Sequence, residues 1–189
     1  MSPLEKQEGI KGGWLRPAVF GAMDGLVSNI ALIAGVAAGA AAAGADQTKT
    51  VILAGFAGLI AGALSMAAGE YVSVVSQRNL LSKQARSSSD SGELNSFVSS
   101  QVNPVVAALS SFASFSAGAI IPLLPYLFGA EVVLYSAVLT AIALFITGAT
   151  VGWITDEHWL RAGGRQLMLG AAAGAATHIL GTITGGVLS

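Results

Sequence analysis

The chain has 189 residues, of which 53% are hydrophobic and only 10% are charged, against about a quarter in ordinary soluble domains. Nine basic and ten acidic side chains leave a net charge of -1, and so few Lys and Arg exclude a nucleic-acid interface. Because there is no cysteine, disulfides, thiolate metal sites and redox-active thiols are excluded, and we expect an integral membrane protein in contact with lipid.

Five apolar runs are long enough to cross a bilayer, which takes about 20 helical residues. An open strand cannot satisfy its backbone in lipid, so the fold class is expected to be an all-α bundle of five transmembrane helices. The predicted helices are 17–45, 51–75, 104–128, 132–154 and 167–188. We expect one transmembrane domain, residues 17–189, preceded by an N-terminal arm, residues 1–16, and interrupted by a polar loop at 76–103. A short helical continuation of the second helix from Gln77 to Arg86 is the expected start of that loop.

The basic residues predict the orientation of these helices. Eight of the nine fall on the arm, on the loop at 76–103 or between the fourth and fifth helices, and only Lys49 lies on the other side. Positive charge is retained on the cytoplasmic side of a membrane. The N-terminus and the loop at 76–103 are therefore expected in the cytosol, and Ser189 on the opposite side.

The first helix carries the first of two carboxylates that lie inside apolar runs, Asp24, and the second helix carries the other, Glu70. A charged side chain at membrane depth costs roughly 2.5 to 3.5 kcal/mol and is functional by default. Each lies eight residues from the nearest basic residue, Arg16 or Arg78, so both are expected about 12 Å from the cytoplasmic border. Equal depth on consecutive helices predicts a shared site. The alternative for Glu70 is a protonated side chain that hydrogen-bonds a neighbouring helix.

Further candidate ligands lie on the same helices. Met66 precedes Glu70 by one turn and shares its face, and Ser28 and Ser73 add hydroxyl groups. Carboxylates with a thioether suit ferrous iron or manganese better than zinc or copper, which prefer thiolates and clustered imidazoles. On the fifth helix, His178 is expected about 20 Å from the basic border, as a proton relay, an exit-side ligand or a histidine hydrogen-bonded within the bundle.

These groups predict a transporter, not an enzyme. A divalent cation and protons would compete for Asp24 and Glu70, so export of one would be coupled to import of the other, with no permanently bound cofactor. The main alternative is a transporter of a non-metal substrate in which the two acids carry protons only. A membrane-embedded hydrolase and a purely structural protein are weaker alternatives, since the first lacks a nucleophile set and the second leaves the buried acids unexplained.

Glycines at four-residue spacing predict close approach between helices. The first helix carries two such pairs, Gly21 with Gly25 and Gly35 with Gly39. They indicate a tight interface, either within the bundle or between two subunits. Because five helices make a narrow structure for an ion pathway, we expect a homodimer through the first helix.

Three segments resemble the vacuolar iron transporter family: FGAMDGLVS at 20–28, AGALSMAAGEYVSVVSQ at 61–77, and the pair at 103–104 leading to IPLLP at 121–125. The resemblance covers the chain from about residue 15 onward. It implies five transmembrane helices, a homodimer, and proton-driven transport of ferrous iron, often with manganese, out of the cytosol. By motif position Asp24, Met66 and Glu70 would be pathway residues.

Two departures make the chain similar to a shorter branch of that family, the nodulin-like vacuolar iron transporter-like proteins of plants. Pro17 stands where family members with a full ion path carry a second aspartate, and the glutamate-rich cytoplasmic helical domain between the second and third helices is missing. The resemblance therefore does not decide between iron and manganese. The richness in alanine and glycine favours a bacterial cytoplasmic membrane; in a eukaryote the family implies the vacuolar membrane.

Overall fold

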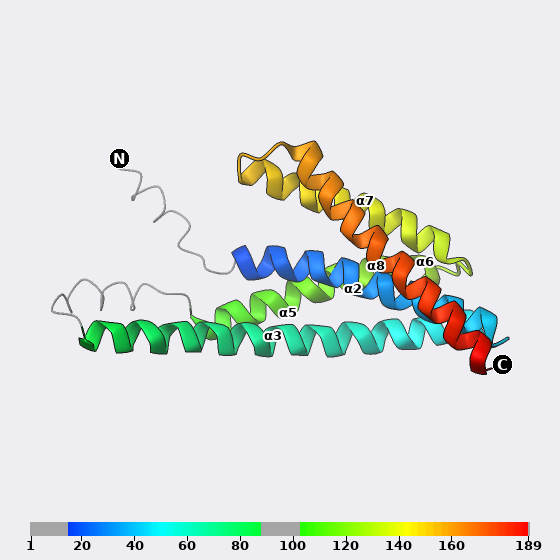
Figure 1. Ribbon diagram of the computed structural model, residues 1–189, viewed down its shortest axis with the longest axis horizontal. Helices are drawn as coiled ribbons and strands as arrows, with labels where there is room; N and C mark the ends of the chain where they lie inside the picture. Colours follow the sequence, from blue (N-terminus) through cyan, green and yellow to red (C-terminus); the bar gives the residue numbers. More distant parts are fainter. Residues whose placement is uncertain (1–14, 88–102, 189) are drawn as a thin grey trace.

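The computed structural model describes residues 15–87 and 103–188, and all regular structure in these ranges is helical. The elements are α2 (Leu15–Ala42), α3 (Gln47–Ser87), α5 (Pro104–Ile120), the 3-10 turn η1 (Ile121–Leu123), α6 (Leu124–Leu127), α7 (Val133–Ile154) and α8 (Trp159–Leu188). Helices α5, η1 and α6 follow one another directly and form one membrane-length unit. Figure 1 shows the resulting bundle of long helices.

Five units in the described ranges are long and apolar enough to cross a membrane: α2, α3, the α5–α6 unit, α7 and α8. Large hydrophobic side chains stand exposed along them, among them Leu53, Ile60, Leu134 and Leu180. An apolar exterior of this extent suits lipid and not water. The predicted fold class, an all-α integral membrane protein with five spans, is confirmed.

Helix α3 is much longer than the predicted span at 51–75. It begins at Gln47 and continues to Ser87, so at 1.5 Å per residue it is about 60 Å long, twice the roughly 30 Å of a hydrocarbon core. The prediction counted apolar residues, whereas a helix keeps its backbone hydrogen bonds beyond the bilayer. The first part of the connection predicted at 76–103 is therefore helical as far as Ser87, in line with the helical continuation expected from Gln77 to Arg86. Its remainder at 88–102 lies outside the described residues, as do 1–14 of the arm.

Helix α8 begins at Trp159, eight residues before the predicted start at 167. The connection from α7 is short, and a bidentate ion pair crosses it: the Arg165 guanidinium donates to both carboxylate oxygens of Glu157 at 2.9 and 3.1 Å. The ion pair with Glu157 allows Arg165 to be part of helix α8 instead of the preceding loop. The predicted polar connection is therefore wrong in extent.

The turn between α2 and α3 is closed by local hydrogen bonds. Helix α2 ends at Ala42, before the predicted residue 45, because Gly44 adopts φ 68° and the Ala45 N–H reaches back to the Ala40 carbonyl. This is a common way to end a helix. Asp46 then caps α3, since its carboxylate accepts the Lys49 backbone N–H at 3.1 Å.

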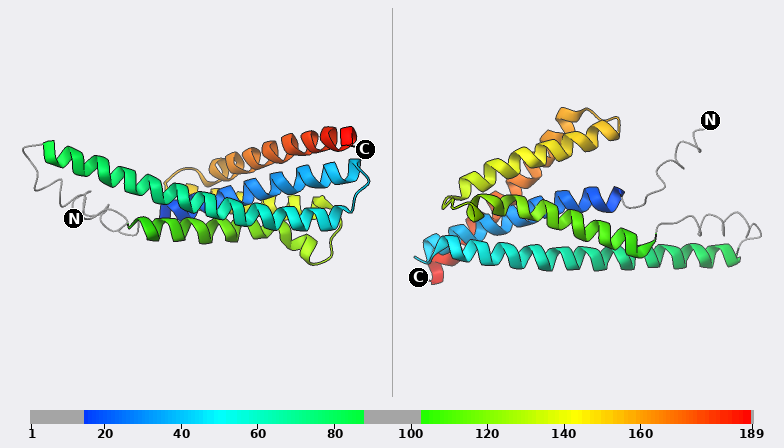
Figure 2. Two further views of the ribbon diagram at one scale, coloured as in Figure 1. Left: turned by 90° about the horizontal axis from the view of Figure 1, so that it is seen from below. Right: turned by 180° about the vertical axis from the view of Figure 1, so that it is seen from behind.

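Helix α2 is the centre of the bundle and contacts α3, α5, α7 and α8. Figure 2 shows it between the α3–α5 side and the α7–α8 side. A Cβ on Gly25 would collide with the α5 backbone at Phe115, and one on Gly181 of α8 would collide with the Gly35 carbonyl. The glycine pairs of α2 therefore serve packing within this chain, which is one of the two uses the sequence left open.

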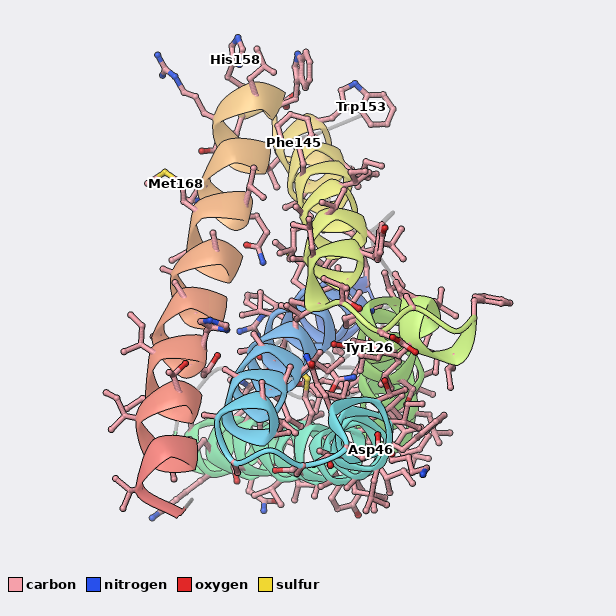
Figure 3. All side chains as sticks on the ribbon, turned by 90° about the vertical axis from the view of Figure 1, so that its right-hand side faces the viewer. Asp46, Tyr126, Phe145, Trp153, His158 and Met168 are labelled. Atoms are coloured by element: carbon pink, nitrogen blue, oxygen red, sulfur yellow. The ribbon has the colours of Figure 1, made fainter. Side chains whose placement is uncertain are left out.

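The connections sort to two opposite ends of the bundle. Figure 1 shows the α2–α3 turn and the α6–α7 connection at one end of the bundle and the α7–α8 hairpin toward the other, and Figure 3, which looks along the bundle, labels Trp153 and His158 on that hairpin. We call the hairpin end the basic end, because Arg161 and Arg165 are there. The arrangement matches the grouping of connections that the sequence predicted, while the side of the membrane that each end faces stays a prediction.

Candidate functional site

A pocket of about 260 Å³ lies between α2, α3 and α5. Three helices supply its wall: Asp24, Ser28, Asn29 and Leu32 come from α2, Gly58, Gly62, Ser65 and Met66 from α3, and Phe115 from α5. At about 30 Å³ for each molecule of liquid water, the pocket has room for a cation that keeps several waters. Three of the predicted site residues, Asp24, Ser28 and Met66, meet here.

Two glycines on the inner side of α3 let side chains of α2 and α5 pack closely against it at the wall of the pocket. A Cβ on Gly62 would overlap the Phe115 ring, and one on Gly58 would overlap the end of Leu32. Phe115 is 3% exposed and forms the floor from α5, in a small buried cluster with Ala63 and Ala119. The glycines of the α3 motif therefore bring α3 close to its neighbours at the position where the polar groups lie.

Asp24 and Ser28 form the polar side of the pocket. They are one turn apart on α2, and the Ser28 hydroxyl donates to Asp24 Oδ1 at 3.0 Å. Both residues are exposed on the open side of α2. The hydrogen bond holds the carboxylate in one orientation and leaves its second oxygen, Oδ2, available to a ligand.

Met66 brings a thioether to the same pocket from α3. Its side chain is half-buried and packs against the cluster of Ala63, Phe115 and Ala119. A carboxylate, a hydroxyl and a thioether around one cavity make a mixed set of hard and soft donors, which suits borderline divalent cations. The sequence predicted these three donors together with a second carboxylate, Glu70, and a second hydroxyl, Ser73.

Glu70 does not line the pocket, in contrast to the expected convergence of two carboxylates. Because α3 packs with Gly58 against Leu32 of α2, counting along antiparallel helices puts Met66 level with Asp24 and Glu70 about 6 Å nearer the basic end. Glu70 is half-buried there, and Ser73, which follows it, is exposed. The prediction took depth from Arg78, which lies inside α3 and does not mark where that helix ends.

His178 lies on the other side of α2. It is exposed and lines a groove of about 580 Å³ between α2, α7 and α8, whose walls are mainly Ala, Gly, Val, Ile and Leu. Among the described residues it shares no cavity with Asp24. Pro17, at the place of the family's second aspartate, is buried near the start of α2, and its carbonyl accepts the Ser114 hydroxyl at 3.5 Å.

Within residues 15–87 and 103–188, no three side chains of the His, Cys, Asp and Glu types cluster as metal ligands. A cation in the α2–α3–α5 pocket would be held by one carboxylate and neutral donors. Such a site binds less tightly than a multi-carboxylate or thiolate cage.

Two polar residues of the pocket, Asn29 and Ser65, were not predicted. Asn29 is 2% exposed and its carboxamide nitrogen donates to the Ala119 carbonyl of α5. The pattern that predicted the site, an ionisable side chain inside an apolar run, does not select an amide. A buried amide in a membrane helix is itself a costly polar group, and this signal was available.

Known proteins resemble most of this chain. A family model described as the VIT family matches residues 15–96 and 90–182. Vacuolar iron transporter homolog 5 of Oryza sativa subsp. japonica is 45% identical over 134 residues, 70% of this chain and 61% of the relative. Vacuolar iron transporter homolog 2 of Arabidopsis thaliana is 42% identical over 143 residues, 75% and 67% respectively. VIT-like transporter 1b of Glycine max is 39% identical over 144 residues, 72% and 61% respectively.

Proposed function

The chain belongs to the VIT family, and on that premise we propose that it moves a divalent metal cation, ferrous iron or manganese, out of the cytosol in exchange for protons. The names of its relatives support iron as a cargo. Since the chain matches between 61% and 67% of the length of the three relatives described above, their activity is carried over as a proposal.

The observation that carries the proposal is the meeting of Asp24, Ser28 and Met66 on one pocket between α2 and α3. Asp24 supplies the charge that attracts a divalent cation, Ser28 orients it, and Met66 provides a soft ligand from the opposite helix. The pocket volume allows the cation to keep part of its water shell. Manganese and ferrous iron accept such mixed coordination more readily than magnesium, which demands near-ideal octahedral oxygen geometry.

We propose that Asp24 binds the cation and a proton in turn, each displacing the other. Glu70 accepts protons one turn nearer the basic end. In this assignment both carboxylates couple proton movement to metal movement, but only Asp24 and Met66 are ligands of the cation. It follows from the register of α2 and α3, in which Glu70 lies beyond the pocket. Ser73 would serve as a hydrogen-bonding partner of Glu70 and not as a metal ligand.

A homodimer is also part of the proposal. Asp24 and Ser28 are exposed on the open side of α2, where lipid would be a poor environment for a carboxylate, at a cost of roughly 2.5 to 3.5 kcal/mol. A second copy that covers this side would remove Asp24 from lipid and complete the wall of the pathway. The contact would use the open side of α2, because the glycines of this helix already pack against α5 and α8.

The proposed orientation puts the basic end, with the α7–α8 hairpin, in the cytosol, following the distribution of Lys and Arg. The plant origin of the relatives above supports a vacuolar membrane. The bacterial membrane inferred from alanine and glycine content rests on composition alone.

The test is uptake of cations into proteoliposomes that contain the full chain, with manganese, ferrous iron, cobalt and zinc offered separately and with or without an imposed pH gradient. Manganese or iron uptake that increases with an opposing proton gradient supports the exchange. Flux that ignores the pH gradient would end the exchange proposal. Met66→Ala should lower uptake about tenfold through loss of a ligand, and Glu70→Gln should weaken the response to pH more than the binding of the cation.

The second candidate, a non-metal substrate with Asp24 and Glu70 as proton carriers, is favoured by one observation, the absence of a multi-carboxylate cluster among the described residues. If this candidate is right, none of the four cations is taken up, and the protein still carries a proton flux that Asp24→Asn removes. If Met66→Ala leaves metal uptake unchanged, the thioether has no role in the pathway.

A further inference from the structure

Asn29 lines the pocket between α2, α3 and α5 and carries an unpaired acceptor. The side chain is 2% exposed, and its Oδ1 atom is buried with no hydrogen-bond partner among the described residues. Buried polar atoms are paired in the great majority of cases, so an unpaired one calls for an explanation. In hydrocarbon the penalty is larger than in a soluble core, because lipid supplies no partner.

The orientation of this amide is fixed by its neighbour on α5. The Ala119 carbonyl accepts a hydrogen bond from the Asn29 side chain, and only the NH2 group of a carboxamide can donate. Rotating the amide by half a turn would set two oxygens against each other. The oxygen Oδ1 must therefore point away from α5.

The atom points toward α3 at the position where that helix has no side chain. A Cβ built on Gly58 would lie 3.3 Å from Asn29 Oδ1. Asn29 and Gly58 line the same pocket as Asp24, Ser28 and Met66. Along α2, Asn29 lies about 7.5 Å deeper in the membrane than Asp24. The pocket thus has a charged oxygen at one level and a neutral, fixed carbonyl oxygen further in.

We propose that Asn29 Oδ1 is a ligand of the transported cation and determines which divalent metals the pocket prefers. The proposal rests on the proposed function, since it assumes that a cation enters this pocket. An amide carbonyl is a hard, neutral oxygen donor of the kind that manganese and calcium sites use, whereas the Met66 thioether is soft. Asn29 favours harder cations and Met66 favours softer ones, and a neutral second oxygen lets the cation leave Asp24 without meeting another negative charge.

The test compares two reciprocal variants of the full chain in detergent, Asn29→Leu and Met66→Leu, by titration with Mn²⁺ and with Cd²⁺. Leucine is close in size to both side chains and brings no donor. Asn29→Leu should weaken Mn²⁺ binding by about tenfold or more and leave Cd²⁺ within about threefold, and Met66→Leu should do the reverse. Equal loss of both cations in Asn29→Leu, or no loss of either, would overturn the proposal.

A structural role for Asn29, through the Ala119 bond or through a bound water, predicts a different outcome. The unfolding temperature without metal would then fall in Asn29→Leu while the Mn²⁺ affinity of the folded protein stayed unchanged. If Asn29→Leu does not fold, Asn29→Asp is the test. If residue 29 is a ligand, the added negative charge should make this variant bind Mn²⁺ more tightly than wild type. Unchanged or weaker Mn²⁺ binding in that variant contradicts the proposal.

Asp24→Asn keeps this test separate from the proposed function. If Asp24→Asn abolishes Mn²⁺ binding and Asn29→Leu does not alter it, the pocket binds metal and only the role of Asn29 is wrong. If wild type binds neither Mn²⁺ nor Cd²⁺ and shows no metal uptake, the proposed function itself fails.

Discussion

Two cavities beside α2 differ in size and in chemistry, and the larger one is the less polar. The groove toward α7 and α8 has about 580 Å³ and mainly apolar walls, with His178 as its one ionisable lining residue among those described. The pocket toward α3 and α5 has about 260 Å³ and gathers a carboxylate, a hydroxyl, an amide oxygen and a thioether.

Between helices in a membrane, volume is a poor guide to function. Lipid tails fill an apolar groove at no cost, so loosely packed helices leave such space without a selective reason. Polar groups around a small cavity are costly in the same environment and persist where they are used. We therefore expect the α2–α3–α5 pocket to be the functional side of the molecule and the α2–α7–α8 side to be structural.

The largest expected effect is on the pocket side. Asp24→Asn removes its charge while keeping the shape of the side chain, so cation uptake into proteoliposomes should fall about 100-fold. The matched control is Asp46→Asn, a carboxylate at the α2–α3 turn that lines neither cavity. Uptake in Asp24→Asn above a tenth of wild type would remove the distinction between the two sides of α2.

The next effect tests the structural side. A Cβ on Gly181 of α8 would collide with the Gly35 carbonyl of α2, whereas a Cβ on Gly174 of the same helix meets nothing within 4 Å. Gly181→Ala should lower the free energy of unfolding by about 1 to 3 kcal/mol, the usual cost of overpacking. Gly174→Ala should change it by no more than about 0.5 kcal/mol. Unfolding in a denaturing detergent measures both, and equal values would contradict close α2–α8 packing.

A smaller effect is expected from the histidine in the larger cavity. His178→Gln keeps a hydrogen-bonding side chain in the α2–α7–α8 groove and should change cation uptake by less than about threefold, the value of an ordinary interhelical hydrogen bond. The measurement is the same uptake assay at two pH values. A tenfold loss, or loss of the response to pH, would make the groove part of the proton pathway.

The smallest effect concerns the turn that joins α2 to α3. Hydrogen bonds from the Lys49 backbone N–H and then its ammonium hold the pKa of Asp46 below the ordinary value of 3.8. Since the pKa is lower in the folded state, Asp46 stabilises the protein above pH 3.8, and this contribution is lost as the pH falls through the folded-state pKa. Asp46→Ala should therefore lower the unfolding temperature slightly at pH 6, and the difference should shrink as the pH is lowered below 3.8. A difference that does not shrink there would rule out the charge as its source.

Much of the fold and part of the site could be predicted from the sequence. The five spans follow from the length of the apolar runs, because lipid forces each of them into a helix. Asp24 was found because it is a carboxylate inside an apolar run. Ser28 and Met66 were found because the four-residue spacing of a helix puts them on the faces of Asp24 and Glu70. Their meeting on one pocket fits that reasoning, and their role in transport stays a prediction.

What the sequence could not supply is how the helices pass one another. Glu70 was expected level with Asp24, but the depth of a residue depends on the register set by contacts such as Gly58 with Leu32. Asn29 lies five residues after Asp24, off the face that was traced, and only the packing of α5 reveals that its oxygen is unpaired. Helix ends were missed for a related reason, since α3 and α8 continue through polar residues that a membrane rule excludes.

The backbone contact between α2 and α8 limits how this molecule can change shape. The Gly35 carbonyl meets Gly181, and the Gly39 carbonyl meets Gly185. At these two contacts no side chain lies between the helices, so no change of rotamer can let them slide past each other. Helices α2 and α8 should therefore move as one body. The contact between α2 and α5 is of the same kind, since Gly25 and Gly118 meet the backbone at Phe115 and Ala22. We therefore expect any opening of the α2–α3–α5 pocket to come from α3, whose Gly58 and Gly62 meet the side chains of Leu32 and Phe115, which can rearrange.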